Sequence, residues 1–288
     1  MVRLTVSADG SSAAFNVTVS GLAVYLDSFA LFDLAEGDAG RRRRFLDTIH
    51  AGVDLLFSIS NVAELIGPQE GSIDAVRSFL DDIGPHWVPA ELDTVEVVNR
   101  ERNGATAPET FICGRFLKDY FSVQLAGVPR ESRTILDPSR DLLRLGGIFD
   151  WVGEQRDSIR RGLADLDTAF INKTAERRIK FKRNPAWLEE AFPILAFRQD
   201  MPATFTQYSL VRNLILRGDT LKRNDGADFC HAIVASAFAN IAALDKKWKR
   251  RVDALPKPNN LAQIYCQPEL DQMVGAIELL LKPPTQAP

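Results

Sequence analysis

The stretch Asn224–Leu255, NDGADFCHAIVASAFANIAALDKKWKRRVDAL, decides the expected fold, because acids, an apolar helix, a short strand and a basic cluster follow one another in it. Asp225 and Asp228 are three residues apart, so on a helix they share one face and both lie in the first turn. The positive end of the helix dipole tolerates carboxylates there. Apolar residues at helical spacing follow from Phe229 to Ala237 and predict a buried helix of about four turns.

The end of this stretch predicts one buried strand, followed by an acid and by cations. Ala239–Leu244 is a short uncharged apolar run, and Asp245 ends it. A basic cluster with Trp248 inside it comes next and would suit phosphates that approach an acidic pocket. A solvated helix face, or a helix C-terminus satisfied by cations, explains the same cluster equally well. The basic residues are Lys246, Lys247, Lys249, Arg250 and Arg251.

Composition sets the bounds within which this stretch is interpreted. The chain has 288 residues, 45% of them hydrophobic, which is enough for one large domain or for a domain with a large insertion. Its formal net charge of −3 means that nucleic-acid contacts would depend on local basic patches. The cysteines, Cys113, Cys230 and Cys266, form no CxxC pair and no metal-ligand spacing, which favours a reducing cytoplasm. We expect neither a signal peptide nor a membrane span, because no run approaches roughly 18 apolar residues.

Two apolar runs near the N-terminus also lead to acids. Leu22–Leu26 has the continuous apolar character of a buried parallel strand, and Asp27 follows it directly. Asp54–Ile59 predicts a second strand, and Glu64 lies one short turn later, in the first turn of the next helix. Taken singly, each acid has a structural explanation, Asp27 as a helix N-cap and Glu64 as the partner of Asn61 in a capping box.

The expected domain that carries this pattern is made of residues 21–67 and 222–288. Residues 1–20 alternate in polarity around a Gly-containing turn and predict an accessory β-hairpin. Near the C-terminus, Ala262–Cys266 predicts one further strand, and Glu269–Leu281 predicts an amphipathic helix.

Residues 68–221 show no clear alternation of strands and helices and predict a helical insertion that roofs or flanks the acids. Asn99–Pro108 is expected to be a surface loop. Lys173–Arg183 carries six basic residues against one acid, which suits either a solvated helix face or a phosphate-contacting surface. The expected helices are Ser72–Ile83, Asp141–Arg161, Leu163–Lys180 and Pro185–Phe197.

The expected fold brings the acids together. In an open parallel α/β sheet, ligands bind at the carboxyl ends of the strands, where Asp27, Glu64, Asp228 and Asp245 all belong. Carboxylates that gather in one pocket repel one another, so a divalent cation is expected to neutralise them. Oxygen ligands without a His or Cys partner point to Mg²⁺ or Mn²⁺, which activate water in phosphodiester cleavage. Asp225 is expected as an additional metal ligand or as an N-cap.

These residues resemble the PIN domain. The resemblance rests on Asp27 after an apolar strand, and on the Ser58–Asn61 turn that leads to Glu64. It rests also on Asp228–Ala232, DFCHA, which is similar to the family's Asp-x-x-(Ile or His)-Ala element, and on Asp245 after the next strand.

The resemblance covers about residues 21–67 and 222–281 and leaves out the middle of the chain. It implies that the matching acids bind Mg²⁺ or Mn²⁺ and that the protein cuts single-stranded or structured RNA. Many members of the family are toxins that an antitoxin inhibits. His231, within the matched element, is expected to be an orienting or packed residue, because a lone His is a poor metal ligand.

The sequence therefore predicts an α/β fold: a PIN-like parallel sheet of four or five strands flanked by helices, a large helical insertion and an N-terminal β-hairpin. The predicted function is a metal-dependent endoribonuclease in which Asp27, Glu64, Asp228 and Asp245 hold the metal and its water, assisted by Asp225. RNA is the expected partner in the cytoplasm, an inhibitory antitoxin-like protein is a further expected partner, and a homo-oligomer stays open. Besides the cluster after Asp245 and Lys173–Arg183, the candidate phosphate contacts are Arg41, Arg42, Arg43 and Arg44.

Two other functions are compatible with the same residues. A catalytically inactive PIN-like module would keep the pocket while the insertion binds RNA or protein. The sequence disfavours this alternative only because all of the expected acids are present. A phosphatase or other phosphoryl hydrolase would use a different α/β scaffold. The sequence disfavours it because Asp27-Ser28-Phe29 lacks the Asp-x-Asp spacing that such scaffolds often have.

Overall fold

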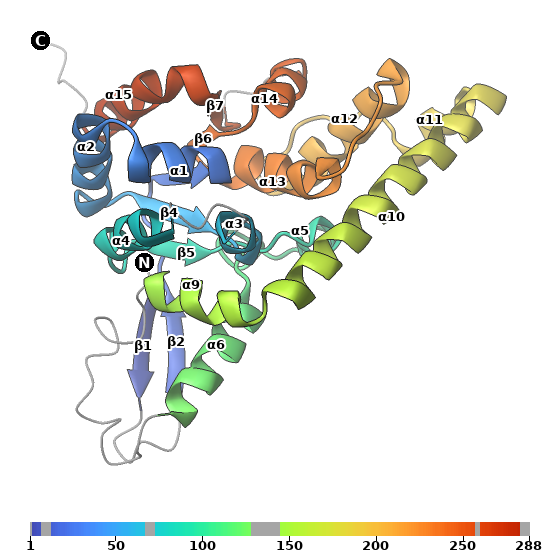
Figure 1. Cartoon of the computed structure of the whole chain (residues 1–288). Coiled ribbons are helices and arrows are strands. Elements are labelled where there is room, and N and C mark those ends of the chain that lie inside the picture. The colour runs from blue at the N-terminus through green and yellow to red at the C-terminus, as the bar shows by residue number, and fades with distance from the viewer. Residues whose placement is uncertain (1, 7–12, 67–72, 128–144, 257–259, 283–288) are drawn as a thin grey trace, which may run out of the picture.

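The structure, a computed structural model, describes residues 2–6, 13–66, 73–127, 145–256 and 260–282 (Figure 1). The strands are β1 Val2–Val6, β2 Ala13–Val17, β3 Ala23–Leu26, β4 Asp54–Phe57, β5 Trp87–Pro89, β6 Ile241–Ala243 and β7 Gln263–Tyr265. The helices of the first half are α1 Ser28–Glu36, α2 Ala39–His50, α3 Ile59–Leu65, α4 Ile73–Ile83, α5 Thr94–Arg102 and α6 Gly114–Ala126. The later helices are α9 Leu145–Glu154, α10 Arg156–Arg183, α11 Ala186–Ala191, α12 Pro202–Arg217, α13 Asp225–Phe238, α14 Lys246–Asp253 and α15 Leu270–Leu281, with the 3₁₀ turn η1 Gln267–Glu269 before α15.

The centre of the molecule is a five-stranded sheet in the order β5-β4-β3-β6-β7, and every neighbouring pair is parallel. This confirms the predicted α/β fold with a parallel sheet flanked by helices. β3 is the middle strand, because Val24 pairs with Leu55 of β4 and with Ile241 of β6. The chain adds β4 and β5 on one side of β3, then β6 and β7 on the other. Ligands of open α/β sheets bind at the carboxyl edge beside such a reversal of strand order.

Alternate side chains of the central strands pack on opposite faces of the sheet. Val24 and Leu26 of β3 belong to the core beneath α1, α2, α4 and α15, whereas Tyr25 belongs to the core beneath α5, α12 and α13. In β6, Ala243 faces the first of these cores and Ala242 the second. Because helices cover both faces, these strands have continuous apolar sequences instead of alternating ones.

The acids at two strand ends also begin the helices that follow. Asp27 is the N-cap of α1, and its carboxylate accepts a hydrogen bond from Ser28 N at 2.8 Å. Asp245 is the N-cap of α14 and accepts from Trp248 N at 2.6 Å. The capping explanation offered for Asp27 by the sequence is therefore correct, and it leaves the other carboxylate oxygen of each acid available.

The capping box predicted for Asn61 and Glu64 is wrong. Helix α3 begins at Ile59, and its capping box joins Ser58 to Asn61, each side chain bonding the other residue's backbone N–H. The helix starts earlier than expected because Ser58 satisfies the N-terminal donors. Glu64 therefore lies beyond the first turn and has no capping role.

The sequence predicted helices Asp141–Arg161 and Leu163–Lys180, whereas the break in the described chain lies at Gln155, between α9 and α10. Helix α10 continues through Gly162 and extends diagonally past the rest of the molecule (Figure 1). The expected break at Gly162 is absent, because an interior glycine costs only about 1 kcal/mol relative to alanine and packing offsets this cost. Leu163 packs against the first core, and the Phe170 ring lies against Phe229 of α13 with centroids 4.7 Å apart. The part of the predicted helix Asp141–Arg161 before Leu145 lies outside the described residues.

Three further helices differ from expectation. α5 includes the first residues of the predicted loop Asn99–Pro108, because Asp93 caps it and Val97 is buried. The predicted helix Pro185–Phe197 is reduced to α11, which ends at Ala191 before Pro193. The sequence did not predict α12 as a separate helix.

The sheet includes part of the expected insertion. β5 lies within residues 68–221, yet it pairs with β4 as an edge strand. The limits of the insertion stay a prediction. β1 and β2 pair antiparallel, with Val2 opposite Val17, while the predicted turn within residues 7–12 lies outside the described residues. Across the described ranges, no helix has both the length and the apolar character required to cross a bilayer.

Candidate functional site

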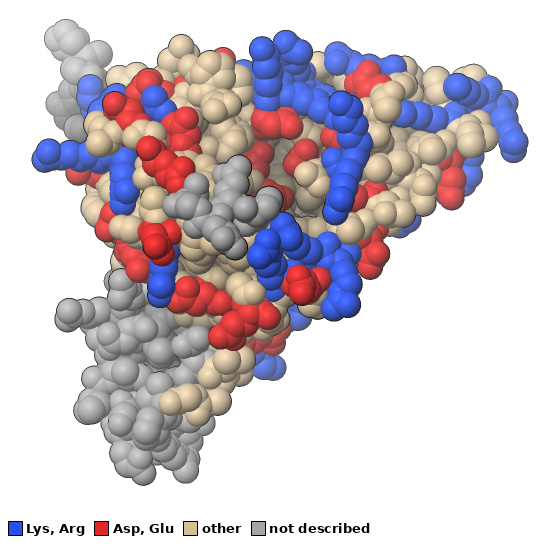
Figure 2. Space-filling view, in the orientation of Figure 1, with Lys and Arg blue, Asp and Glu red and all other residues tan. Residues whose placement is uncertain are grey.

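A cavity of about 800 Å³ opens at the carboxyl edge of the sheet, among α1, α3, α10, α13 and the start of α14. Figure 2 shows a hollow with acidic atoms inside it and Lys and Arg side chains on either side. The acids that line the cavity are Asp27, Glu64, Asp167, Asp228 and Asp245, and the cations that line it are Arg160 and Arg223. The four acids predicted to form the centre of the site thus lie around a single cavity.

The sheet explains why these acids meet. Asp27 directly follows β3, and its N–H donates to the carbonyl of Ala243 in β6 at 3.1 Å. Asp245 therefore lies beside it, two residues beyond the end of β6. A helix that precedes a parallel strand runs antiparallel to it, so the N-terminus of α13, with Asp228, lies at the same edge.

A hydrogen-bond network beneath the cavity holds Glu64. The Ser28 hydroxyl lies between Glu64 and Asp27 and can donate to either carboxylate. His231 is completely buried, and its Nε2 lies 3.1 Å from Ser60 Oγ and 3.6 Å from Glu64 Oε1. Burial alone would lower the pKa of His231, but the hydrogen bond and charge of Glu64, with the charges of Asp27 and Asp228, raise it to about 8.

The other ring nitrogen of His231 contacts Tyr25, a buried residue of β3. Burial raises the pKa of Tyr25 well above its usual value, so the phenol keeps its proton. The Tyr25 hydroxyl also lies 3.4 Å from Asn61 Oδ1, and Asn61 Nδ2 donates to the carbonyl of Leu26 at 3.2 Å.

His231 is thus an orienting and packed residue, and its protonated ring stabilises the charged form of Glu64. Burial raises the pKa of Glu64, but the bonds from His231, Ser28 and Ser60 together lower it.

Asp228 differs from the other acids because its carboxylate has no partner. Within the described residues it makes no hydrogen bond and no ion pair, although it is half-buried beside three other acids. Burial raises the pKa of Asp228, and the charges of Asp27, Asp245 and Glu64 raise it further, to about 8. Burial likewise raises the pKa of Asp27, with Glu64 and Asp245 adding to the effect. The cavity therefore brings together acids whose charged forms disfavour one another.

The donor set suits a hard divalent cation. Asp27, Glu64, Asp228 and Asp245 offer carboxylate oxygens without a thiolate, and the unpartnered Asp228 is disfavoured as an anion until a cation approaches. In the described ranges, no three His, Cys, Asp or Glu side chains converge closely enough to enclose an ion. The fit consequently rests on the chemistry of the donors and on their shared cavity.

Asp225 does not line this cavity. Its buried carboxylate pairs with Lys247 Nζ of α14 and accepts from Lys222 N at 2.6 Å. The predicted role as an additional metal ligand is therefore wrong for this geometry, and Asp225 stabilises the start of α13 instead. The sequence could not show this, because Lys247 is 22 positions away.

The basic cluster after β6 divides into tethered and exposed side chains. Arg251 is 3% exposed, lies over the Trp248 ring and pairs with Asp219, so its prediction as a phosphate contact is wrong. Lys249 pairs with Asp253 and donates to the carbonyl of Ile264 at 2.7 Å.

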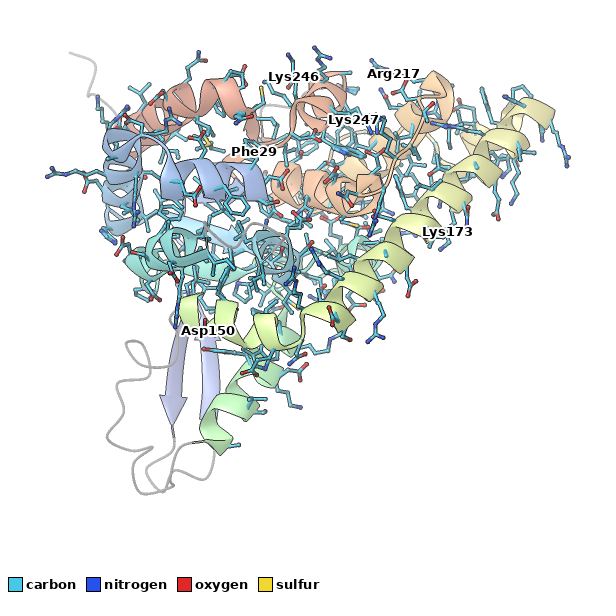
Figure 3. All side chains as sticks on the ribbon, in the orientation of Figure 1. Phe29, Asp150, Lys173, Arg217, Lys246 and Lys247 are labelled. Atoms are coloured by element: carbon cyan, nitrogen blue, oxygen red, sulfur yellow. The ribbon has the colours of Figure 1, made fainter. Side chains whose placement is uncertain are left out.

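Lys246 and Arg250 are exposed, without an ion pair among the described residues. Figure 3 shows Lys246 and Lys247 on α14, above α13 in this view.

The other two predicted basic surfaces do not line the cavity. In α2, Arg41, Arg42 and Arg44 form ion pairs with acids of neighbouring helices. Arg43 is exposed and has no ion pair within the described ranges. In the Lys173–Arg183 run of α10, the side chains of Arg177, Arg178 and Lys180 contact Phe192, the carbonyl of Leu214 and Trp187, respectively.

Asp167 is a residue of the site that the sequence did not reveal. It lies on α10, is 5% exposed, and its carboxylate accepts from Asn224 N at 2.8 Å, Gly226 N at 2.9 Å and Ala227 N at 3.3 Å. The N-cap residue of α13, Asn224, has a positive φ of 77° and provides no side-chain cap. Asp167 supplies that cap from another helix. Gly226 is 59 positions away, so no local pattern could indicate the contact.

Gly226→Ala is expected to destabilise the protein by about 1–3 kcal/mol, because an added methyl group would overpack this contact. A Cβ at Gly226 would lie 2.8 Å from Asp167 Oδ1 and 2.9 Å from its Cα, so α10 would have to move. Urea-induced unfolding measures the effect. The matched control is Gly162→Ala in α10, where a Cβ would meet nothing within 4 Å. It is expected to stabilise by about 0.5–1 kcal/mol. Equal effects of the two substitutions would contradict the proposed contact.

Comparison of the chain with protein-family models, with curated proteins and with solved structures finds no match. The function is therefore inferred from the residues and their geometry.

Proposed function

We propose that this protein is a metal-dependent endoribonuclease of PIN type, which uses Mg²⁺ or Mn²⁺ to cleave RNA phosphodiester bonds. One observation carries the proposal. Asp27, Glu64, Asp228 and Asp245, from separate segments of the chain, line the same cavity, and Asp228 has no protein partner in the described residues. Carboxylates that gather in one cavity are typical of sites that bind divalent metal ions.

Each acid has a role that follows from its surroundings. Asp27 and Asp245 are held by their capping hydrogen bonds, so each presents a carboxylate oxygen with little freedom to rotate. Asp228 supplies an unpartnered carboxylate. Glu64 is kept charged by the His231 imidazolium and can orient or deprotonate a water molecule. A divalent ion bound by these acids would lower the pKa of water and neutralise charge on the phosphate.

Cations at the rim can bind the phosphates next to the cleaved bond. Arg160 and Arg223 line the cavity, and both are exposed and without an ion pair in the described part of the chain. Lys246 and Arg250 on α14 provide further positive charge. Such contacts position the RNA backbone without regard to sequence. The cysteines, which form no CxxC pair, suggest the reducing cytoplasm as the location. The resemblance to PIN domains also suggests an inhibitory antitoxin-like protein as a partner.

The direct test is incubation with labelled single-stranded RNA and DNA in the presence of Mn²⁺ or EDTA. The expected result is RNA cleavage with Mn²⁺ and none with EDTA. RNA binding without cleavage in Mn²⁺ or Mg²⁺ would instead support the catalytically inactive PIN-like binding module. Cleavage that continues in EDTA would contradict both the metal and the assigned roles of the acids.

A further inference from the structure

One wall of the acidic cavity is apolar, although neither the acids nor a metal requires such a wall. Phe29 and Phe32 of α1 both line the cavity and are only partly buried. They are three residues apart and therefore lie on one face of the helix. Leu163 and Ala164 of α10 also line the cavity. Figure 3 labels Phe29 on α1.

The two rings contribute to the core only in part. The core contact of α1 is made by Ala30, Leu31 and Leu34, which are fully buried. Phe29 and Phe32 pack at the margin of this core and keep part of each ring open to the cavity. An aromatic face that borders an acidic pocket can stack on a planar group of a ligand.

The lining of the cavity matches the parts of a nucleotide. The acids suit a metal-bound phosphate, Arg160 and Arg223 at the rim suit neighbouring phosphates, and Phe29 with Phe32 suits a nucleobase. The volume of about 800 Å³ is within the range of small-molecule sites, roughly 300–1,000 Å³. A base inside a duplex cannot present its face to a side chain, because its neighbours in the stack cover both faces.

We propose that the cavity is a subsite for one unpaired nucleotide, in which the base lies against Phe29 and Phe32 while its phosphate faces the acids. Phe29 and Phe32 are then specificity-determining residues that select unpaired over base-paired segments. This inference rests on the proposed nuclease function for the identity of the ligand, but it concerns binding and not cleavage.

The test separates base contacts from phosphate contacts. Two labelled oligonucleotides of equal length are compared by fluorescence anisotropy, a single-stranded RNA and a fully abasic chain with the same number of phosphates. Ca²⁺ replaces Mn²⁺ so that a divalent ion is present, and gel electrophoresis checks that the RNA stays intact. The proteins are the wild type, Phe29→Ala, Phe29→Trp and the control Phe181→Ala, whose ring is partly buried on α10 outside the cavity.

Wild type and Phe181→Ala are expected to bind RNA about tenfold more tightly than the abasic chain, since one stacked base contributes about 1–3 kcal/mol. Phe29→Ala is expected to lose most of this preference while its affinity for the abasic chain is unchanged, and Phe29→Trp is expected to keep it. If Phe29→Ala weakened binding of both chains equally, the base subsite would be rejected. If binding followed the prediction but no metal allowed cleavage, the subsite would hold and the nuclease function would fail.

Discussion

Asp228→Asn is expected to abolish RNA cleavage without destabilising the protein. The substitution keeps the shape of the side chain but removes the carboxylate that we assign to the metal. In metal sites, removal of a residue that only hydrogen-bonds to a metal ligand already lowers metal affinity or activity about 10–100-fold. Removal of a metal ligand itself is therefore expected to lower the cleavage rate by about 100-fold or more. No hydrogen bond within the described residues depends on this carboxylate.

Stability distinguishes this variant from one that simply misfolds. Burial and the neighbouring acids disfavour the charged form of Asp228, so a neutral amide is expected to raise the free energy of unfolding at pH 8 in EDTA. Cleavage assays and urea-induced unfolding of the same preparations measure both effects. The control is Asp165→Asn, an exposed acid of α10, which is expected to change neither. Wild-type cleavage by Asp228→Asn would exclude the proposed site.

Divalent metal is expected to raise the melting temperature, and to do so more at pH 8 than at pH 5. In EDTA, Asp228 ionises near pH 3.8 when unfolded but near pH 8 when folded. The folded state therefore binds more protons between these values, and its stability falls as the pH rises from about 4 to about 8. A bound cation would remove this penalty, because it replaces the proton as the neutralising charge.

Saturating Mn²⁺ at about 100 times its dissociation constant adds about 2.7 kcal/mol. This corresponds to a rise of roughly 4–5 °C for a chain of this size, because the entropy of unfolding is about 2.1 cal/mol/K per residue. Thermal unfolding at pH 5 and pH 8, with Mn²⁺, Mg²⁺ or EDTA, measures the shift. In Asp228→Asn the shift is expected to be much smaller at both pH values. A shift of the same size in wild type and Asp228→Asn would place the metal elsewhere.

Strands β3, β4, β6 and β7 and the acids near them could be predicted from the sequence because both are local features. Leu22–Leu26 is apolar throughout, and Asp27 follows it, so burial on two faces and the position of the acid follow from neighbouring residues. The same holds for Ala239–Leu244 and Asp245. A general property of parallel sheets, that their carboxyl ends share one edge, was then sufficient to place the acids together.

Packing between helices decides which of the two acids in the first turn of α13 faces the cavity. Asp225 and Asp228 have equivalent positions in the sequence of α13, but Lys247 of α14 pairs with Asp225 and turns it away from the cavity. The basic cluster was likewise ambiguous. Arg251 lies buried over Trp248, whereas Arg250 is exposed. Helical spacing alone does not show which neighbour will cover a given face.

The sequence by itself determined the fold class, the strands β3, β4, β6 and β7 with the order of the acids along the chain, and the edge of the sheet at which the acids gather, but not the edge strand β5. These follow from local polarity and from rules that hold for every parallel sheet. Only the tertiary structure decided that Asp167 of α10 caps α13, that His231 supports Glu64, and that Phe29 borders the cavity. Such contacts join residues distant in the chain, and their formation depends on how close-packed side chains fit together, which no single segment encodes.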